Sequence, residues 1–105
     1  MGKIRNDKYK LVTEHYSNGI IRAIKIVDDN NKSQGEGKYF HESGKFWYRA
    51  FFKDGYFMGK IDDYDEYGNY LYTSYYSHVI MANTISEQEY KKELAMIRLG
   101  LIKVP

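Results

Sequence analysis

The sequence predicts a mainly β protein with one C-terminal α-helix (α+β), arranged as an antiparallel β-hairpin meander of about three repeats that the helix caps. Three observations predict this fold. An aromatic residue or a His stands four residues before a Gly at three places, and apolar residues alternate after each of these glycines. The C-terminal segment instead has the spacing of a helix. The three places are His15 to Gly19, Phe40 to Gly44 and Tyr64 to Gly68.

These three glycines are 25 and 24 residues apart, a period typical of a repeat protein. A repeat of this length is one small supersecondary unit that cannot bury its own apolar face, so it must stack on its neighbours. A chain of 105 residues has room for one such domain. We therefore expect a single domain over residues 1–105, with the repeat meander in 9–80 and the capping helix in 86–100.

The segments after the glycines alternate with period two, which is the spacing of side chains on one face of a strand. After the second and third glycines the matching positions are Phe46, Tyr48, Ala50 and Phe52, then Tyr70, Tyr72, Ser74 and Tyr76. The offsets between them place Trp47, Arg49 and Phe51, then Thr73 and Tyr75, on the opposite face. The first repeat has Ile21, Ala23, Lys25 and Val27 at the same offsets. We predict strands near residues 9–16, 20–27, 37–41, 46–53, 56–61 and 69–78.

Turn residues separate these strands. Asn18-Gly19 and Asp54-Gly55 are dipeptides that accept positive φ at both central positions of a type I′ turn, which suits a two-residue hairpin loop. Ser43-Gly44 and Tyr67-Gly68 are weaker signals of the same kind. The polar stretch of residues 28–37 contains glycine and predicts a longer loop between the first two repeats.

The C-terminal segment predicts a helix over residues 87–99. Ser86 and Glu89 form the sequence pattern of a capping box, and Gly100 is placed to end the helix in a left-handed conformation. An apolar stripe recurs at steps of four, three and four residues, in Tyr90, Leu94, Ile97 and Leu101. The solvent side is expected to carry Lys91, Lys92, Glu93 and Arg98. We expect this helix to cap the open end of the stacked repeats.

Composition limits the class of protein. The chain has no Cys, which excludes disulfides and thiolate metal sites. It has no apolar run of membrane-spanning length, and its start lacks the apolar core of a signal peptide, so a cytoplasmic protein without a membrane span is expected. Its 16 basic and 14 acidic residues are nearly balanced, which argues against a nucleic-acid mimic and a phosphate-tracking binder. Charges cluster modestly at Lys3, Arg5, Lys8 and Lys10, and at Asp62, Asp63, Asp65 and Glu66.

The sequence has no pattern typical of an enzyme. A calcium loop starting at Asp63 would lack the bidentate Glu at its twelfth position, where Ser74 stands. The three His residues are spread one per repeat, without the spacing of a metal site, and no nucleophile elbow frames a Ser. Gly35 and Gly37 precede a predicted strand, so they are no phosphate cradle. We predict no catalytic residue, no metal site and no cofactor.

Aromatic residues make up 17% of the chain, with 12 Tyr, and two interpretations of them remain open. Tyr and Phe fill the thin cores of stacked strands, but Tyr, Trp and Arg also dominate protein interfaces. If the helix covers the other face of the sheet, one row of side chains is a partner-binding surface. If the helix covers this row, it is core. The row consists of Trp47, Arg49, Phe51, Thr73 and Tyr75.

Residues 35 to 72 resemble the MORN-variant repeats of the bacterial YwqK-type antitoxin family. The resemblance covers about a third of the chain well and the first repeat loosely; the loop at 28–34 and the helix after Ser86 depart from the family's pattern. It implies a small β-meander and a toxin-neutralising or other protein-binding role. The matching residues are Tyr39, Phe40 and Gly44, then Phe52, Lys53, Asp54, Gly55 and Gly59, then Tyr64, Asp65 and Gly68.

The function we expect is therefore a non-enzymatic protein-binding inhibitor of antitoxin or immunity type, which blocks a toxin or another partner protein. The abundance of Lys, Ile, Asn and Tyr is typical of AT-rich genes, so the bacterial cytosol is the expected location and the chain is alternatively a phage-encoded inhibitor of a bacterial defence nuclease. A third hypothesis is a nucleic-acid or anionic-lipid binder that uses Lys3 to Lys10 with aromatic residues. The oligomeric state is left open.

Overall fold

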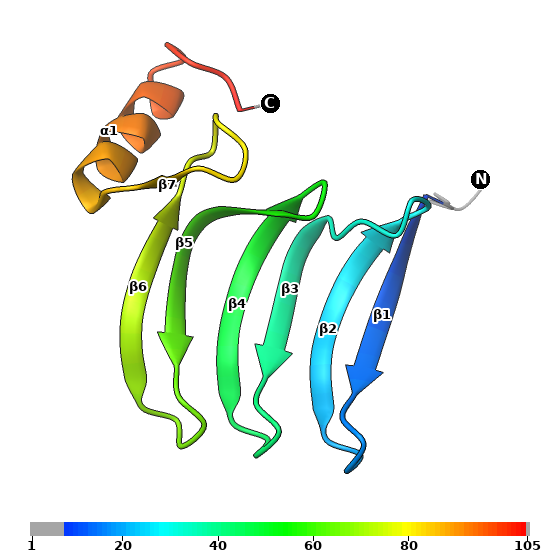
Figure 1. Ribbon diagram of the computed structural model, residues 1–105. Helices are drawn as coiled ribbons and strands as arrows, with labels where there is room; N and C mark the ends of the chain where they lie inside the picture. The colour runs from blue at the N-terminus through cyan, green and yellow to red at the C-terminus, as the bar shows by residue number, and fades with distance from the viewer. Residues whose placement is uncertain (1–7, 105) are drawn as a thin grey trace, which may run out of the picture.

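The structure, a computed structural model, describes residues 8–104 and consists of one open antiparallel sheet followed by one helix (Figure 1). The sheet has seven strands, and each strand pairs with the next one along the chain, so the sheet is a meander without crossovers. The predicted fold class is confirmed. The strands are β1 (Tyr9–His15), β2 (Ile21–Asp28), β3 (Gly35–Phe40), β4 (Phe46–Lys53), β5 (Tyr56–Tyr64), β6 (Tyr70–Tyr76) and β7 (Thr84–Ile85), and the helix is α1 (Glu87–Arg98).

The three repeat glycines have the same local geometry. Their φ angles are +88°, +91° and +94° for Gly19, Gly44 and Gly68, in the region that an L side chain avoids. In each turn the Gly N–H donates to the carbonyl of the residue three positions earlier, and the N–H of that residue donates to the carbonyl of the residue after the Gly. The repeat in the sequence is therefore a repeat in the backbone.

The turn type at Gly19 differs from the prediction. Only Gly19 has positive φ there, whereas a type I′ turn needs positive φ at Asn18 as well. The hydrogen bonds from Tyr16 N–H to Ile20 O and from Gly19 N–H to Tyr16 O instead fit a three-residue loop that ends in a left-handed Gly. A type I′ geometry does occur at Asp54 and Gly55, with φ of 50° and 83°.

A β-bulge follows each of the three turns that contain Gly19, Gly44 and Gly68. The register shifts by one residue in each repeat, so that Phe40 pairs with Phe46 while Tyr39 pairs with Tyr48. Trp47 is the unpaired extra residue, and Arg22 and Leu71 take the same place three residues after their own glycines. A bulge moves the strand alternation to the other face of the sheet. Residues that the alternation predicts on one face, such as Phe46 and Tyr48, therefore lie on opposite faces because a bulge stands between them.

One face of the sheet, which we call the core face, holds the buried apolar side chains. Ala23, Val27, Ala50 and Ile61 are at most 4% exposed. Large half-buried rings surround them on the same face; Tyr39 and Tyr48 stack with centroids 4.7 Å apart, and further rings continue the cluster. Aromatic pairs of this kind contribute about 0.5–1.5 kcal/mol each beyond their buried area. The other rings of the cluster are Phe52, Phe57 and Tyr76.

Side chains in the turns bind each repeat to the next. Tyr16 Oη donates to Phe40 O at 2.7 Å, and His41, one repeat later, places Nε2 2.7 Å from Tyr64 O. Because a carbonyl only accepts, His41 Nε2 carries the proton. In the last turn Asp65 holds the same position, and its carboxylate accepts from the N–H groups of its own turn instead. The turns thus form a continuous hydrogen-bonded edge.

The loop between the first two repeats is more regular than predicted. Asp28 N–H donates to Lys32 O and Asn31 N–H donates to Asp28 O, the same pattern as in the glycine turns. Asn31 takes the place of Gly with φ of 63°, which Asn tolerates better than most residues. Strand β3 consequently begins at Gly35 rather than at residue 37.

Acid is expected to weaken the last turn through Asp65. The backbone N–H of Asn69 and further donors hold the pKa of this carboxyl below its usual 3.8. A lowered native pKa contributes stability that is present above pH 3.8 and is lost as pH falls through the native value. Asp65→Asn keeps an acceptor oxygen but does not titrate. We expect its melting temperature to lie below that of the wild type at pH 7 and the gap to narrow below pH 3.8; a gap that stays constant with pH would contradict this assignment.

The C-terminal helix begins and ends as the sequence predicts. Ser86 and Glu89 form the capping box. Gly100 has φ of +74°, and the hydrogen bonds from Gly100 N–H to Ile97 O and from Leu101 N–H to Met96 O make a Schellman motif. Leu101, the last residue of the predicted apolar stripe, is 67% exposed.

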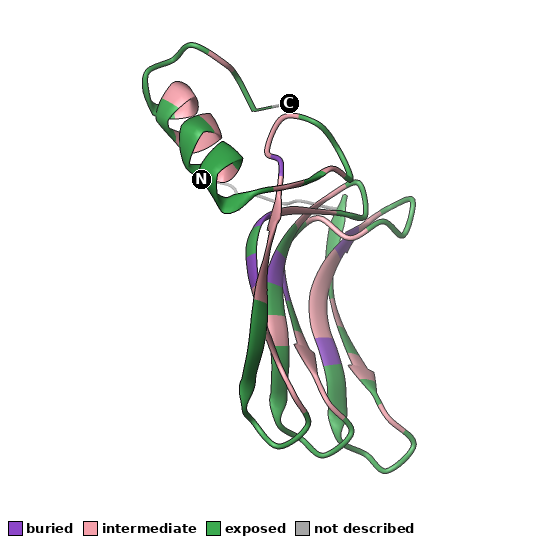
Figure 2. Ribbon diagram, turned by 60° about the vertical axis from the view of Figure 1, so that its left-hand side comes forward, coloured by how far each residue is buried: buried purple, intermediate pink, exposed green. Residues whose placement is uncertain are grey.

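The contacts that attach α1 to the sheet differ from those that the apolar stripe predicts. No residue of the helix is buried, and α1 stands past the end of β6 instead of packing on the strands (Figure 2). Glu93, which was expected on the solvent side, has a side chain only 13% exposed and accepts hydrogen bonds from Ser77 Oγ and His78 N–H. The helix is therefore held mainly by a carboxylate and by the ring of Tyr90.

Replacing Gly44 by Val is expected to destabilise the sheet by more than about 1 kcal/mol, because Val does not tolerate φ of +91°. A Cβ at this position would meet only Ile20, at 4.0 Å, so backbone strain and not a clash is the cause. Urea unfolding measures the effect. Glu42→Val in the same turn, at an exposed residue without positive φ, is the control. Equal stability of the two variants would contradict the turn assignment.

Candidate functional site

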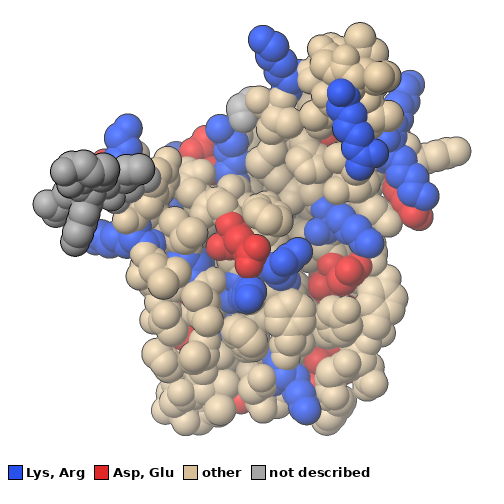
Figure 3. Space-filling model, turned by 180° about the vertical axis from the view of Figure 1, so that it is seen from behind, with Lys and Arg blue, Asp and Glu red and all other residues tan. Residues whose placement is uncertain are grey.

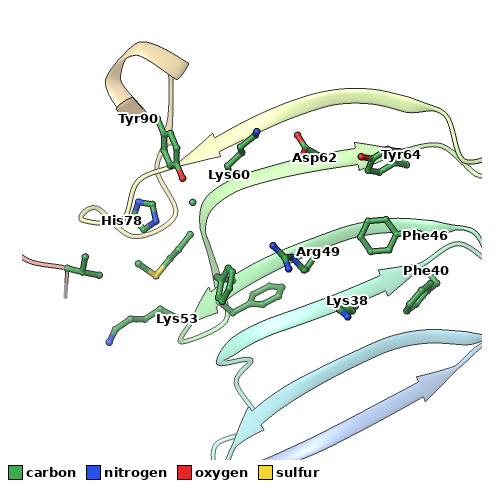
Figure 4. A pocket seen from close by; sticks show the side chains of 15 residues that line it. Lys38, Phe40, Phe46, Arg49, Lys53, Lys60, Asp62, Tyr64, His78 and Tyr90 are labelled. Atoms are coloured by element: carbon green, nitrogen blue, oxygen red, sulfur yellow. The ribbon is translucent and has the colours of Figure 1, made fainter. Parts of the chain in front are cut away.

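The face opposite the core face carries a groove of about 1050 Å³, and we call it the groove face. Side chains from β3, β4 and β5 form its floor, while the segment after β6, the helix and the C-terminal segment close one end (Figure 4). The lining consists of Lys38, Phe40, Phe46, Arg49, Phe51, Phe52, Lys53, Met58, Gly59, Lys60, Asp62, Tyr64, His78, Tyr90 and Val104.

A row of cations crosses the floor of the groove. Lys38 of β3 pairs with Arg49 of β4, and Lys60 of the next strand, β5, lines the same groove. Neighbouring strands lie about 4.8 Å apart, so Lys38 and Arg49 are close neighbours. Figure 4 shows the three cations on successive strands, and Figure 3 shows Lys and Arg side chains across the middle of this face, with Asp and Glu beside them.

Acidic groups in and beside the groove only partly balance this charge. The lining holds four Lys or Arg residues and one carboxylate, Asp62, although the whole chain has a net charge of only +2. Asp62 accepts a hydrogen bond from the hydroxyl of Thr73. Glu36, beside the groove, lies 3.7 Å from the Arg49 guanidinium. The local excess of positive charge favours an anionic ligand.

An aromatic ladder borders the cation row on the side of the glycine turns. Its rings come from four successive strands, and their centroids are 5.8–6.0 Å apart in edge-on or tilted arrangements. Bulges place two of these rings, Phe46 and Tyr70, because each bulge returns the residue before it to the groove face. The ladder consists of Phe40, Phe46, Tyr64 and Tyr70.

Tyr90 and His78 form the opposite end of the groove. The ring of Tyr90 lies 5.0 Å from that of Tyr75 and 5.5 Å from that of His78. Gly59 makes this approach possible: it has φ of +84°, and a Cβ there would lie 3.2 Å from His78 Nε2. On the other side of the His78 ring, Glu93 Oε1 lies 3.3 Å from Nδ1.

The five predicted site residues do not form one surface. Arg49 and Phe51 lie in the groove, and the Arg49 guanidinium is 5.9 Å from the centre of the Phe51 ring. Thr73 and Tyr75 lie on the groove face beside it, through their contacts with Asp62 and Tyr90. Trp47 is the exception, since it lies on the core face.

The position of Trp47 follows from the bulge. Its ring stacks on His41 at 4.9 Å, touches Tyr48 edge-on and lines a hollow of about 230 Å³ with Ile61 and Tyr76. Burial there raises the pKa of the Asp63 carboxyl above its usual 3.8, although a hydrogen bond with the Trp47 side chain opposes this. Trp47 therefore packs between repeats on the core face.

Sequence reasoning missed Lys38, Lys60 and the aromatic ladder. Lys38 and Lys60 belong to the strands on either side of Arg49, so only the strand register brings the three together. The expected cluster of Lys3, Arg5, Lys8 and Lys10 is not comparable with the groove, because Lys3 and Arg5 lie outside the described residues.

Within residues 8–104 no group of three His, Asp or Glu side chains is placed to hold a metal ion. Over the same residues no helix has the length and apolarity needed to cross a membrane. Comparison with protein-family models, curated proteins and solved structures found no match to this chain. The likeness to the YwqK-type repeats is therefore a resemblance only.

Proposed function

We propose that this protein is a non-enzymatic protein-binding module of antitoxin or immunity type, which inhibits a partner protein in the bacterial cytosol by covering its active surface. The observation that carries the proposal is the groove itself. It combines a central cation row with exposed rings on a sheet face that no other layer covers within the described residues.

Arg49 and Phe51 have the properties of interface hot spots. Arg and aromatic residues supply much of the binding energy in protein complexes, because they are large and combine apolar area with directed polar contacts. Phe51 is half exposed, and Arg49 packs over its ring, so a partner that covers both would bury a preorganised pair. The surrounding cations select a partner surface rich in Asp and Glu.

The rigid arrangement of the groove suits an inhibitor. Hydrogen bonds between successive turns and stacked rings on the core face hold β3, β4 and β5 in one register. A surface that is already ordered loses little conformational entropy on binding, which favours tight and slowly reversible blocking. The resemblance to YwqK-type repeats supports a toxin as the target. A defence nuclease is the alternative target, and the same surface would bind and block it.

Affinity capture followed by reconstitution tests the proposal. The tagged chain is incubated with lysate of the cells that carry its gene, with and without nuclease treatment, and captured proteins are identified by mass spectrometry. We expect a protein whose capture survives nuclease, and whose purified form loses activity when one equivalent of the chain is added. A captured protein that keeps full activity in the complex would contradict the inhibitor role.

Single-stranded nucleic acid is the second candidate, because cations beside aromatic rings also bind phosphates and stacked bases. The ladder rings pack edge-on against each other, and Arg49 is partly engaged by Glu36, so we rank this candidate lower. A gel-shift titration with a labelled oligonucleotide at several salt concentrations decides between them. Tight binding that weakens steeply with salt would favour nucleic acid.

A further inference from the structure

The outer edge of β1 is open in the part of the chain that the structure describes. Among residues 8–104, β1 pairs only with β2, and no strand lies on its other side (Figure 1). Leu11 in this strand is 73% exposed, the most exposed of the large apolar side chains within the strands. An edge strand with free N–H and C=O groups is a template for pairing with another chain. A partner strand is therefore the natural occupant of this edge.

The opposite edge of the sheet is covered at one end. Strand β7 already pairs with Tyr75 and Tyr76 of β6, and α1 stands beside them. Head-to-tail pairing of β1 with β6 of another copy would build an open filament, and β7 together with α1 obstructs it at that end. Pairing of β1 with β1 uses the edge that no strand covers among residues 8–104; both copies then use the same edge and the assembly closes as a dimer.

The sequence of β1 is complementary to itself. We propose that β1 of two copies pair antiparallel about a two-fold axis at Val12, so that all residues from Tyr9 to His15 find a partner. Residues whose numbers sum to 24 are then opposite each other, which sets Lys10 against Glu14 of the second copy, twice. Opposite charges facing each other across two strands stabilise the pair.

Glu14, the acidic residue of this contact, is already paired with a cation of its own chain. Glu14 lies 3.0 Å from Lys25 of β2 on the core face. In the dimer the same carboxylate sits between Lys25 and Lys10 of the second copy. On the other face, exposed Leu11 lies beside Thr13 of the second copy, which covers part of its apolar surface. Charge and apolar contact thus support the same register.

The dimer places both grooves on one side of a continuous sheet, because its two-fold axis is perpendicular to the sheet. A single strand pair buries less area than a standard interface, so we expect a dimer that dissociates on dilution. Sedimentation velocity across a concentration series detects it. A wild-type chain that remains monomeric at the highest soluble concentration would overturn the proposal.

Charge reversal tests the register. Lys10→Glu sets two carboxylates opposite each other at both ends of the strand pair, and Glu14→Lys sets two ammonium groups there. Each variant alone should therefore dissociate at least about ten-fold more readily than the wild type. An equimolar mixture of the two restores both opposite-charge pairs and should form a heterodimer. Lys45→Glu in an exposed turn makes the same charge change away from β1 and should dimerise like the wild type.

Circular dichroism and melting of each variant show that the fold is kept, since the Glu14–Lys25 contact is partly exposed and contributes little. Association of Lys10→Glu equal to that of the wild type would overturn the register at Val12. A mixture that remains monomeric while the wild type dimerises would do the same.

Discussion

Replacing Glu93 by Ala is expected to release α1 and β7 from the sheet. The Glu93 carboxylate accepts from Ser77 Oγ and from His78 N–H, both at 2.5 Å, and Ser77 is almost fully buried. Hydrogen bonds to a charged acceptor contribute about 1.5–3 kcal/mol each, and an orphaned buried donor adds its own cost. Because no helix residue is buried, apolar packing does not replace this contact. We expect a loss of about 3 kcal/mol in the local stability of this segment.

Hydrogen exchange measures this release. The amides of residues 84–98 should lose protection in Glu93→Ala, while those of β2 to β5 keep theirs. Lys91→Ala on the same helix is the control: Lys91 pairs with Glu87 at 3.3 Å at an exposed position, and such a pair contributes about 0.3–0.5 kcal/mol. Protection of α1 in Glu93→Ala equal to that in Lys91→Ala would contradict the anchoring role of Glu93.

Reversing two charges at the centre of the groove is expected to abolish partner binding. Arg49→Glu together with Lys60→Glu turns two of the three cations of the row into anions. Loss of attraction, and repulsion of an acidic partner, should weaken binding at least about 100-fold, since removing one buried interfacial charge pair alone costs about 2–5 kcal/mol. The fold should melt within a few degrees of the wild type, because both side chains are exposed.

Arg22→Glu together with Lys45→Glu is the matched control for this variant. It changes the net charge by the same amount at exposed positions outside the groove lining. Binding to the captured partner, measured by surface plasmon resonance, should stay within a few-fold of the wild type in the control. Equal weakening in both variants would show that total charge, and not the groove, governs binding.

The strands and the helix could largely be predicted from the sequence. Glycines at a fixed period, alternating apolar residues and the capping box at Ser86 are local signals, and each specifies backbone geometry within a few residues. Strand β5 extends to Tyr64 instead of ending at residue 61, and the two-residue β7 was not predicted. Strand β7 forms because β6 lies beside it. Two residues are too few to show the period-two pattern of a strand.

The faces of the strands could not be predicted as well. Period-two reasoning assumes an unbroken alternation, and the bulges at Arg22, Trp47 and Leu71 break it in every repeat. Arg22 is charged, whereas Trp47 and Leu71 are uncharged, apolar and different in size, so residue type does not reveal the bulge. The error matters most for Trp47, which was placed beside Arg49 and Phe51 and lies on the core face.

Long-range placement explains the other differences. Lys38 and Lys60 lie on the strands beside that of Arg49 and join it only through the order of strands in the sheet, which a single strand's pattern does not encode. Glu93 stands next to Lys91 and Lys92 in a polar run that is typical of a solvent face. Its side chain is only 13% exposed because the chain after β6 presents a hydroxyl and an N–H to it. Such a partner is visible only once the helix is placed.

Site-specific photo-crosslinking tests the central claim most directly, namely that the groove face is the surface that binds the partner. A photoreactive phenylalanine replaces Phe51 on the groove face in one variant and Leu71 at the bulge outside the groove in another; these residues are matched in exposure, at 51% and 52%. Irradiation in the native cells should give a protein adduct from position 51 that excess wild-type chain suppresses, and little adduct from position 71. Adducts from position 71 alone, or adducts of nucleic acid at position 51, would contradict the account.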